Sequence, residues 1–220
     1  MNRTLNVLIV CALFAVPGMA SLITNGSFET PSVGPVLAPG STAIVGWTVV
    51  GPDSIDILPD GSAGIAAENG SYFLDLTGPG YGPSQGGVTQ TVTLAAGNYN
   101  LTFYLGSLDS YEPDSVYASA GDQSNVVFTN SDLGAGTHWN LETLNFNVAT
   151  SGPVTISLVG DASGTLSSSP YVGLDDVDVE TAGSAPAGSA PEPSYFIPVL
   201  LGLGAWACIR RKTHPPAAAI

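Results

Sequence analysis

Three acidic side chains of this sequence occupy positions suited to binding calcium. Glu29 opens the main body of the chain, and Asp175 and Asp176 lie in the segment that closes it. The first and last strands of a jelly roll are commonly neighbours, so these carboxylates are expected to converge at one sheet edge. Calcium prefers carboxylate and carbonyl oxygens, about six to eight of them. Glu29 and Asp176 are therefore predicted ligands of a structural Ca²⁺ ion, with Asp175 as a third.

Two other interpretations of the acids stay open. Asp175 and Asp178 can instead face solvent from the last strand, where side chains alternate between faces. A second acidic group, Asp53, Asp56 and Asp60, lacks the D-x-D-x-D-G spacing of a calcium loop. We assign that group to a turn.

One short motif matches a catalytic nucleophile. Residues 82–86 read Gly-Pro-Ser-Gln-Gly, which fits the G-x-S-x-G pattern. That pattern needs a strand before it and a helix after it, with an acid and a histidine downstream. Here a Gly/Pro turn precedes the serine, a strand-like run follows it, and His138 is the only histidine of the body. No catalytic residue is assigned, and we predict that the protein is not an enzyme.

Sugar binding would require exposed aromatic side chains that can stack on sugar rings. The candidates are the tyrosines in or near turn-rich segments: Tyr81, Tyr111, Tyr117 and Tyr171. Trp47 and Trp139 lie in apolar strand contexts, and large aromatic residues there are usually buried. We expect both tryptophans in the core.

The distribution of charge excludes one large class of functions. The chain of 220 residues has 4 Lys+Arg against 18 Asp+Glu, and residues 4–209 contain no Lys or Arg. Nucleic-acid binding depends on basic side chains that contact phosphates, and a field of this sign repels polyanions. We therefore predict no nucleic-acid partner and an affinity for cations.

Both ends of the chain read as export signals. Arg3, the apolar run 7–16 and the small residues before Ala20 form a secretory signal peptide over residues 1–20, cleaved after Ala20. Residues 182–190 are a flexible linker of small residues. An apolar segment, 195–209, follows, and a basic cluster ends it. That segment is a predicted transmembrane helix, short for a full span.

The C-terminal end resembles a known sorting signal. Pro191, Glu192 and Pro193, the apolar segment and the basic residues Arg210 and Arg211 are similar to the PEP-CTERM signal of Gram-negative bacteria. The resemblance covers residues 191–220 and implies an exosortase as processing partner. Residues 213–220 continue beyond the basic cluster, which departs from the usual pattern. A plain membrane anchor is the alternative.

The body, residues 21–181, carries the pattern of short β-strands. Apolar residues alternate with polar ones, as at Leu101, Phe103 and Leu105, and clusters of Gly, Pro and Asn separate the runs. The predicted strands lie around 22–29, 44–50, 71–76, 88–94, 101–105, 115–120, 125–129, 144–148, 154–158 and 172–180. No helical apolar stripe is present. The pattern predicts an all-β protein with an antiparallel two-sheet β-sandwich.

The body also resembles a family. Residues 25–29 read Asn-Gly-Ser-Phe-Glu, Gly46-Trp47 follows, and residues 174–179 read Leu-Asp-Asp-Val-Asp-Val. These motifs are similar to the choice-of-anchor C family, which is related to domain of unknown function 642 and to galactose-binding-like jelly rolls. The resemblance implies a non-enzymatic surface protein that holds polysaccharide.

Together these patterns predict an exported protein, anchored in the membrane by its C-terminal segment and then sorted to the cell surface or extracellular matrix of a Gram-negative bacterium. Its predicted role is to bind or organise extracellular polysaccharide. The alternative is a structural or adhesive surface protein that binds proteins or calcium only, without specific recognition of sugars.

Overall fold

The structure is a computed structural model that describes residues 21–30, 36–79, 85–107, 114–130, 138–161 and 171–183. Residues 20–184 form one compact unit, and all of the described residues belong to it. Several predicted features lie outside the described residues: the cleavage site at Ala20, the sorting residues Pro191, Glu192, Pro193, Arg210 and Arg211, and the apolar segment 195–209. No helix in the described part of the chain is long and apolar enough to span a membrane.

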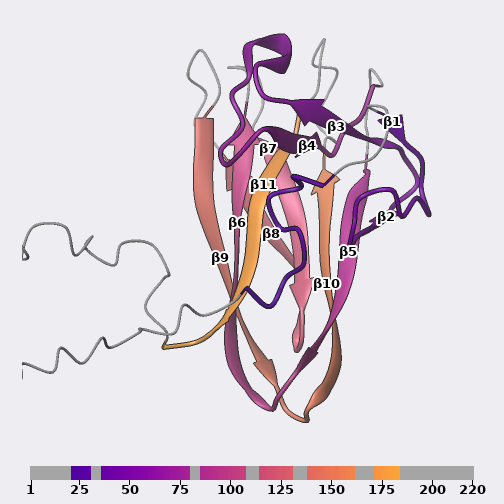
Figure 1. Cartoon of the computed structure of the whole chain (residues 1–220). Helices are drawn as coiled ribbons and strands as arrows, with labels where there is room; N and C mark the ends of the chain where they lie inside the picture. Colours follow the sequence, from indigo (N-terminus) through magenta and orange to yellow (C-terminus); the bar gives the residue numbers. More distant parts are fainter. Residues whose placement is uncertain are drawn as a thin grey trace, which may run out of the picture. The chain divides into compact units, whose positions relative to one another are not determined.

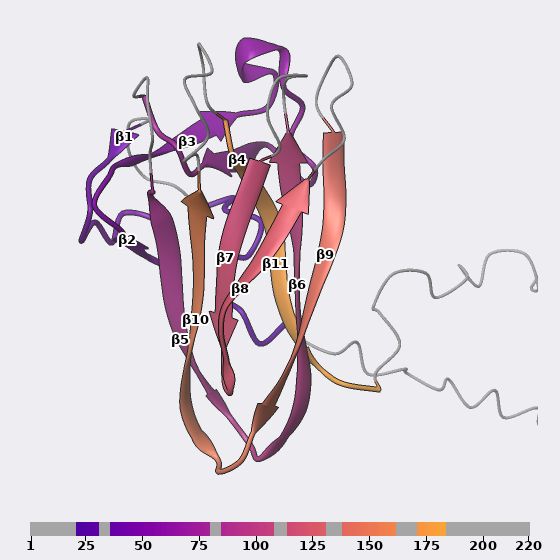
Figure 2. The same ribbon diagram turned by 180° about the vertical axis from the view of Figure 1, so that it is seen from behind.

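The described residues form two antiparallel sheets that pack face to face (Figures 1 and 2). The six-stranded sheet has the order β1 (Val36–Leu37), β3 (Ile55–Pro59), β4 (Tyr72–Asp75), β11 (Gly173–Thr181), β6 (Gly97–Ser107) and β9 (His138–Val148). The five-stranded sheet has the order β2 (Thr48–Val50), β5 (Gly87–Leu94), β10 (Gly152–Asp161), β7 (Asp114–Ala120) and β8 (Gln123–Asn130). One 3₁₀ turn, η1 (Ser62–Gly64), lies between β3 and β4. The predicted all-β, two-sheet sandwich is confirmed.

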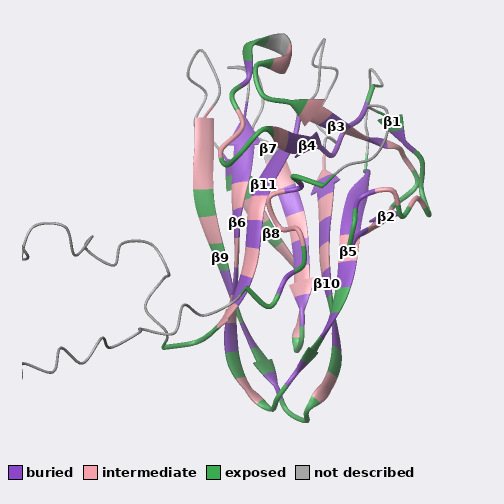
Figure 3. Ribbon diagram, in the orientation of Figure 1, coloured by how far each residue is buried: buried purple, intermediate pink, exposed green. Residues whose placement is uncertain are grey.

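The core lies between the sheets and follows the predicted alternation. On β6, Leu101, Phe103 and Leu105 are fully buried, whereas Thr102 and Tyr104 face outward and remain partly exposed (Figure 3). Because side chains of a strand alternate between its two faces, each long strand gives one row to the core and one to the outside. The outward rows of the six-stranded sheet are therefore the surface on which a site can form.

The opening segment, residues 22–29, is not the strand that we predicted. Asn25 and Phe28 have φ angles of 55° and 57°, in the left-handed region that a strand does not use. The segment nevertheless runs beside the last strand, because the N–H of Val177 donates to the carbonyl of Gly26 at 3.0 Å. A Cβ atom on Gly26 would overlap the Val177 carbonyl oxygen, so only glycine fits there.

Strand β3 corrects a second prediction. The acidic cluster of Asp53, Asp56 and Asp60 was assigned to a turn, but Asp56 lies inside β3 and pairs with Asp75 of β4. Ile55 and Ile57 point into the core, so the alternation is regular. Acidic residues are uncommon in strands, so the sequence pattern did not reveal strand β3.

Two polar side chains join the sheets at the open edge of β9. The Nδ2 of Asn130, on β8, donates to the carbonyls of Leu105 at 2.8 Å and His138 at 2.9 Å. In the turn that links β7 to β8, the Oδ1 of Asp122 accepts a hydrogen bond of 2.7 Å from the N–H of Asn147. These bonds fix β9 against the neighbouring sheet at both of its ends.

Candidate functional site

The three predicted calcium ligands each contact the same segment of chain, residues 68–72. The Oε1 of Glu29 accepts hydrogen bonds from the N–H groups of Ser71 at 2.7 Å and Tyr72 at 2.9 Å. The Oδ2 of Asp175 accepts from the N–H groups of Glu68 and Asn69, both at 3.0 Å. The Nδ2 of Asn69 donates to the Oδ1 of Asp176 at 3.2 Å. All three acids therefore hold residues 68–72.

This arrangement does not form a cation cage. Asp175 is fully buried, and its other oxygen accepts the N–H of Asp176 at 2.7 Å, so both of its oxygens are engaged. Burial raises the pKa of Asp175 to about 7, against the effect of these N–H donors. Among the described residues, no group of three or more His, Cys, Asp or Glu side chains is arranged to hold a metal ion. Calcium binding stays a prediction.

A small second core covers the outer face of the six-stranded sheet near its β3–β4 end. It consists of Ile65, Phe73 and Tyr171, with Trp139 packed against them. The Phe73 ring meets the rings of Trp139 and Tyr171 edge-on, with centroids 5.9 and 6.3 Å apart. The Nε1 of Trp139 donates to the carbonyl of Ala66 at 2.9 Å. Tyr171 is 5% exposed, which corrects its assignment as a sugar-stacking residue.

Two glycines make room for this second core. Gly106 and Gly173 are register partners on β6 and β11. A Cβ atom on Gly106 would lie 2.6 Å from the Trp139 ring, and one on Gly173 would lie 2.9 Å from it. Both distances are too short for a side chain, so the indole ring lies directly on the backbone of the sheet.

The other predicted aromatic residues divide between core and surface. Tyr117 faces outward from the five-stranded sheet, and its hydroxyl donates to Asp161 at 2.8 Å. Tyr81 and Tyr111 lie outside the described residues. Trp47 is 2% exposed and packs against Phe28, which confirms its predicted place in the core.

A polar surface that we did not predict as a site lies on the outer face of β6 and β9. We call it the polar ladder, and it consists of five cross-strand pairs, or rungs: Asn98 with Asn147, Asn100 with Asn145, Thr102 with Thr143, Tyr104 with Leu141, and Gly106 with Trp139. Every side chain of the first four rungs is exposed or partly exposed. At about 3.4 Å per residue the ladder is about 27 Å long.

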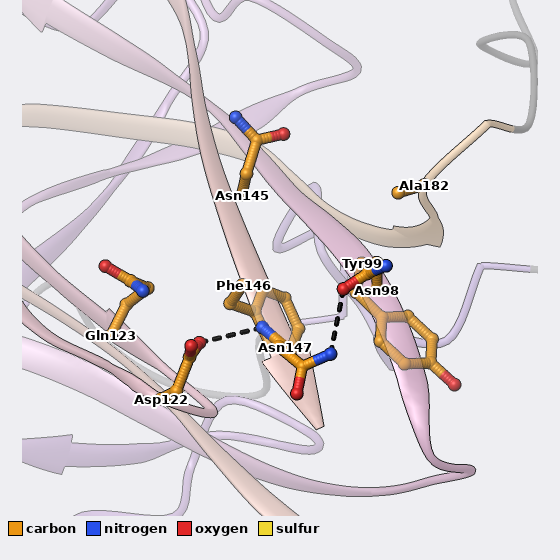
Figure 4. A pocket seen from close by; sticks show the side chains of 8 residues that line it. All are labelled: Asn98, Tyr99, Asp122, Gln123, Asn145, Phe146, Asn147 and Ala182. Carbon is orange, nitrogen blue, oxygen red and sulfur yellow. Dashed lines mark hydrogen bonds between the residues drawn. The ribbon is translucent and has the colours of Figure 1, made fainter. Parts of the chain in front are cut away.

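The asparagine end of the ladder opens into a shallow hollow. The hollow measures about 250 Å³, and eight residues line it: Asn98, Tyr99, Asp122, Gln123, Asn145, Phe146, Asn147 and Ala182 (Figure 4). The Nδ2 of Asn147 donates to the Oδ1 of Asn98 at 2.8 Å, which holds the first rung together. Tyr99 and Phe146 also line the hollow, and their stacked rings, with centroids 5.5 Å apart, belong to the core between the sheets.

The chemistry of the ladder is that of neutral hydrogen bonding. Each asparagine amide offers donors and an acceptor, and each threonine hydroxyl offers both. Tyr104 adds a phenol, and Leu141, at 57% exposure, adds an apolar surface. Such a surface suits a ligand that carries many hydroxyl groups and some apolar faces. The alternation of Asn145 and Asn147 with Leu144 and Phe146 was the only signal of it in the sequence.

A second pair of acids lies on the same outer face, toward β3. Asp56 and Asp75 are register partners, and Asp75 is 8% exposed. Burial raises the pKa of Asp75 to about 6, while hydrogen bonds from Thr77 oppose the shift. The Oδ1 of Asp56 is buried without a hydrogen-bond partner, and burial also raises the pKa of this residue. The pair is the most strongly desolvated acidic contact outside Asp175.

No family model and no curated protein matches this chain. Among solved structures it is similar to TmCBM61 in complex with β-1,4-galactotriose, with a TM-score of 0.51 and 15% identity over 74% of this chain and 99% of that one. It is also similar to a cyclase from Fischerella sp. TAU, with a TM-score of 0.51 and 19% identity over 74% and 97%. A Stig cyclase, Fisc, from the same organism has a TM-score of 0.50 at 19% identity, over 73% and 96%.

These likenesses correct one prediction. We predicted that the chain is not an enzyme, and that exclusion is wrong, because cyclases have the same fold across most of its length. At this level of identity the likeness concerns the fold alone. The sandwich is thus a scaffold that is compatible both with holding a sugar chain and with catalysis.

Proposed function

We propose that this chain is an exported bacterial surface protein whose sandwich binds extracellular polysaccharide along the polar ladder. The observation that carries the proposal is the ladder itself. Two adjacent strands present four asparagines and two threonines on one uncovered face, and the row ends in a hollow. The likeness to TmCBM61, which was solved with a galactose trisaccharide, supports a sugar-binding role for this fold.

The ladder suits a polymer better than a single sugar. Its rungs repeat about every 7 Å along two strands, so a chain lying along them would meet the same kind of group several times. Each hydrogen bond contributes only about 0.5–1.5 kcal/mol after the loss of water contacts. Useful affinity therefore requires several rungs at once, which a polysaccharide can engage.

The sequence supports the rest of the proposal. The predicted signal peptide would export the protein, and the PEP-CTERM-like end would anchor it in the membrane until an exosortase processes it. A sandwich attached in this way faces the extracellular matrix, where polysaccharide is abundant. The acidic body, without Lys or Arg, suits binding through hydroxyls rather than through charge.

The test is a pull-down of the protein on insoluble or immobilised polysaccharides: the host's own exopolysaccharide, a galactan, a glucan and a mannan. Asn100→Ala/Asn145→Ala removes one complete rung, and we expect it to weaken binding about tenfold, or about 1.4 kcal/mol. The matched control is Thr91→Ala/Thr155→Ala, which removes an exposed cross-strand pair from the other sheet. This control should bind like wild type.

Two results would contradict the proposal: no binding to any of these polymers, or an equal loss in both double variants. Capture of host surface proteins by a protein that ignores polysaccharide would favour the adhesive alternative. The same incubation also tests for catalysis, because cleavage of the bound polymer would release new reducing ends.

A further inference from the structure

Carboxylates border the polar ladder on the β11 side. In the register of β11 and β6, Glu180 lies opposite Asn100 and Asp178 lies opposite Thr102. Both acids are partly exposed and lie on the outward row of β11. Val179, which lies between them in the sequence, is buried. Neighbouring strands are about 4.8 Å apart, so each of these two rungs has a carboxylate directly beside it.

The Tyr104 rung has acidic neighbours as well. Burial raises the pKa of the Tyr104 phenol, and the nearby charges of Glu68 and Asp176 raise it further. At the other end, Asp122 lines the hollow. Acidic side chains therefore lie near the Asn100, Thr102 and Tyr104 rungs, and Asp122 lies on the β9 side of the hollow.

No basic side chain of the described residues neutralises this border. None of the described residues is a Lys or Arg, and the described contact of Asp178 with another side chain is a hydrogen bond of 2.5 Å from the Ser21 hydroxyl. A carboxylate is a strong acceptor for the hydroxyl groups of a neutral sugar. The same carboxylate repels a uronate carboxyl group, and no Lys or Arg side chain in the described part of the chain offsets that repulsion.

We infer that the polar ladder selects neutral polysaccharides and that Asp178 and Glu180 exclude chains of uronic acids. This inference rests on the proposed function and specifies its ligand class. The two acids are specificity determinants: they accept hydrogen bonds from hydroxyls and set the sign of the potential along the ladder.

The experiment compares each neutral polymer with its own charged derivative. The galactan, glucan and mannan are used as such and after oxidation of their primary hydroxyls to carboxylates, with the full chain and with EDTA present to remove bridging cations. We expect wild type to bind at least one neutral polymer, and its oxidised form at least tenfold more weakly. Asp178→Asn/Glu180→Gln should reduce that ratio to about twofold, because the amides no longer repel carboxylates.

Asp161→Asn is the control, because it removes one negative charge from the five-stranded sheet, and it should leave the ratio unchanged. Raising the NaCl concentration to about 0.5 M should also narrow the ratio in wild type, since salt screens exposed charges. Equal binding of neutral and oxidised polymer by wild type would overturn the inference while the proposed function stands. Absence of binding to every polymer would contradict both.

Discussion

Asp175 on β11 accepts a hydrogen bond of 3.0 Å from the backbone N–H of Asn69, a residue 106 positions earlier in the chain. The same carboxylate holds the N–H groups of Glu68 and Asp176. One buried acid thus fixes Glu68 and Asn69, and the charge of Glu68 is close enough to raise the pKa of Tyr104 in the polar ladder.

Asp175→Ala should be strongly destabilising. It leaves three backbone N–H groups without their acceptor, and each unsatisfied buried group costs about 1–3 kcal/mol. We expect the free energy of unfolding to fall by about 3 kcal/mol in urea denaturation. Asp175→Asn, which keeps one acceptor oxygen, should lose less of the free energy of unfolding. The control Glu180→Ala should stay within about 0.5 kcal/mol of wild type. A loss for Asp175→Ala no larger than that for Glu180→Ala would contradict the assignment.

The stability of the sandwich should decrease as the pH rises from about 4 to 7. The pKa values of Asp75 and Asp175 are raised by burial to about 6 and about 7, from 3.8. In that window the native state binds more protons than the unfolded state, so its stability is greatest at the acidic side and is lost as the pH rises through the native pKa values. The Asp75 shift alone, about two pH units, corresponds to up to about 3 kcal/mol.

Urea midpoints measured at pH 5 and pH 8 test this dependence. Asp75→Asn should reduce the difference between them, because it removes one titrating group while an amide oxygen can still accept from Thr77. A urea midpoint that rises steadily from pH 5 to pH 8 would contradict the raised pKa values of Asp75 and Asp175.

Gly106→Ala should destabilise the second core. The new Cβ atom would lie 2.6 Å from the Trp139 ring, and overpacking of this kind costs about 1–3 kcal/mol. Gly152→Ala is the control, since a Cβ atom there meets nothing within 4 Å. It should be neutral or slightly stabilising by thermal unfolding. Equal melting temperatures for the two variants would mean that the indole ring does not lie on Gly106.

The calcium hypothesis predicts a higher melting temperature in millimolar calcium and no such rise in Asp176→Ala. Asp176 is the informative position, because its described side-chain contact is a single hydrogen bond from Asn69, whereas both oxygens of Asp175 hold backbone N–H groups. A thermal scan with calcium or EDTA is sufficient. An unchanged melting temperature of the wild-type protein in calcium would contradict the calcium hypothesis.

The sandwich could be predicted from the sequence because its core rows alternate cleanly. Leu101, Phe103 and Leu105 show this pattern on β6, and buried apolar rows are the main determinant of strand position. Strand β3 was missed because Asp56 interrupts its apolar pattern with an acid that is partly buried against Asp75. The segment 22–29 was mistaken for a strand because its apolar residues do not reveal the left-handed turns at Asn25 and Phe28.

The polar ladder could not be predicted, because it depends on register. Asn98 and Asn147 become a rung only when β6 and β9 pair with these two residues opposite each other, and nothing local in the sequence specifies a pairing across 49 positions. The contact of the opening segment with the last strand was predicted from topology, and the Val177 N–H does donate to the Gly26 carbonyl. The partners of Glu29, Asp175 and Asp176 at residues 68–72 were not predicted, since that segment has no pattern of its own.

The position of β11 has a mechanical consequence. β11 leads to the C-terminal end of the described sandwich and pairs with β6 on both sides of an irregularity between Asp175 and Asp178, and β6 carries one side of the polar ladder. A pulling force applied between a held polysaccharide and the C-terminal end would pass from β6 directly to β11. The force would load the backbone hydrogen bonds between β6 and β11 in shear, so that these bonds resist together instead of separating one at a time. The five-stranded sheet would carry little of that load.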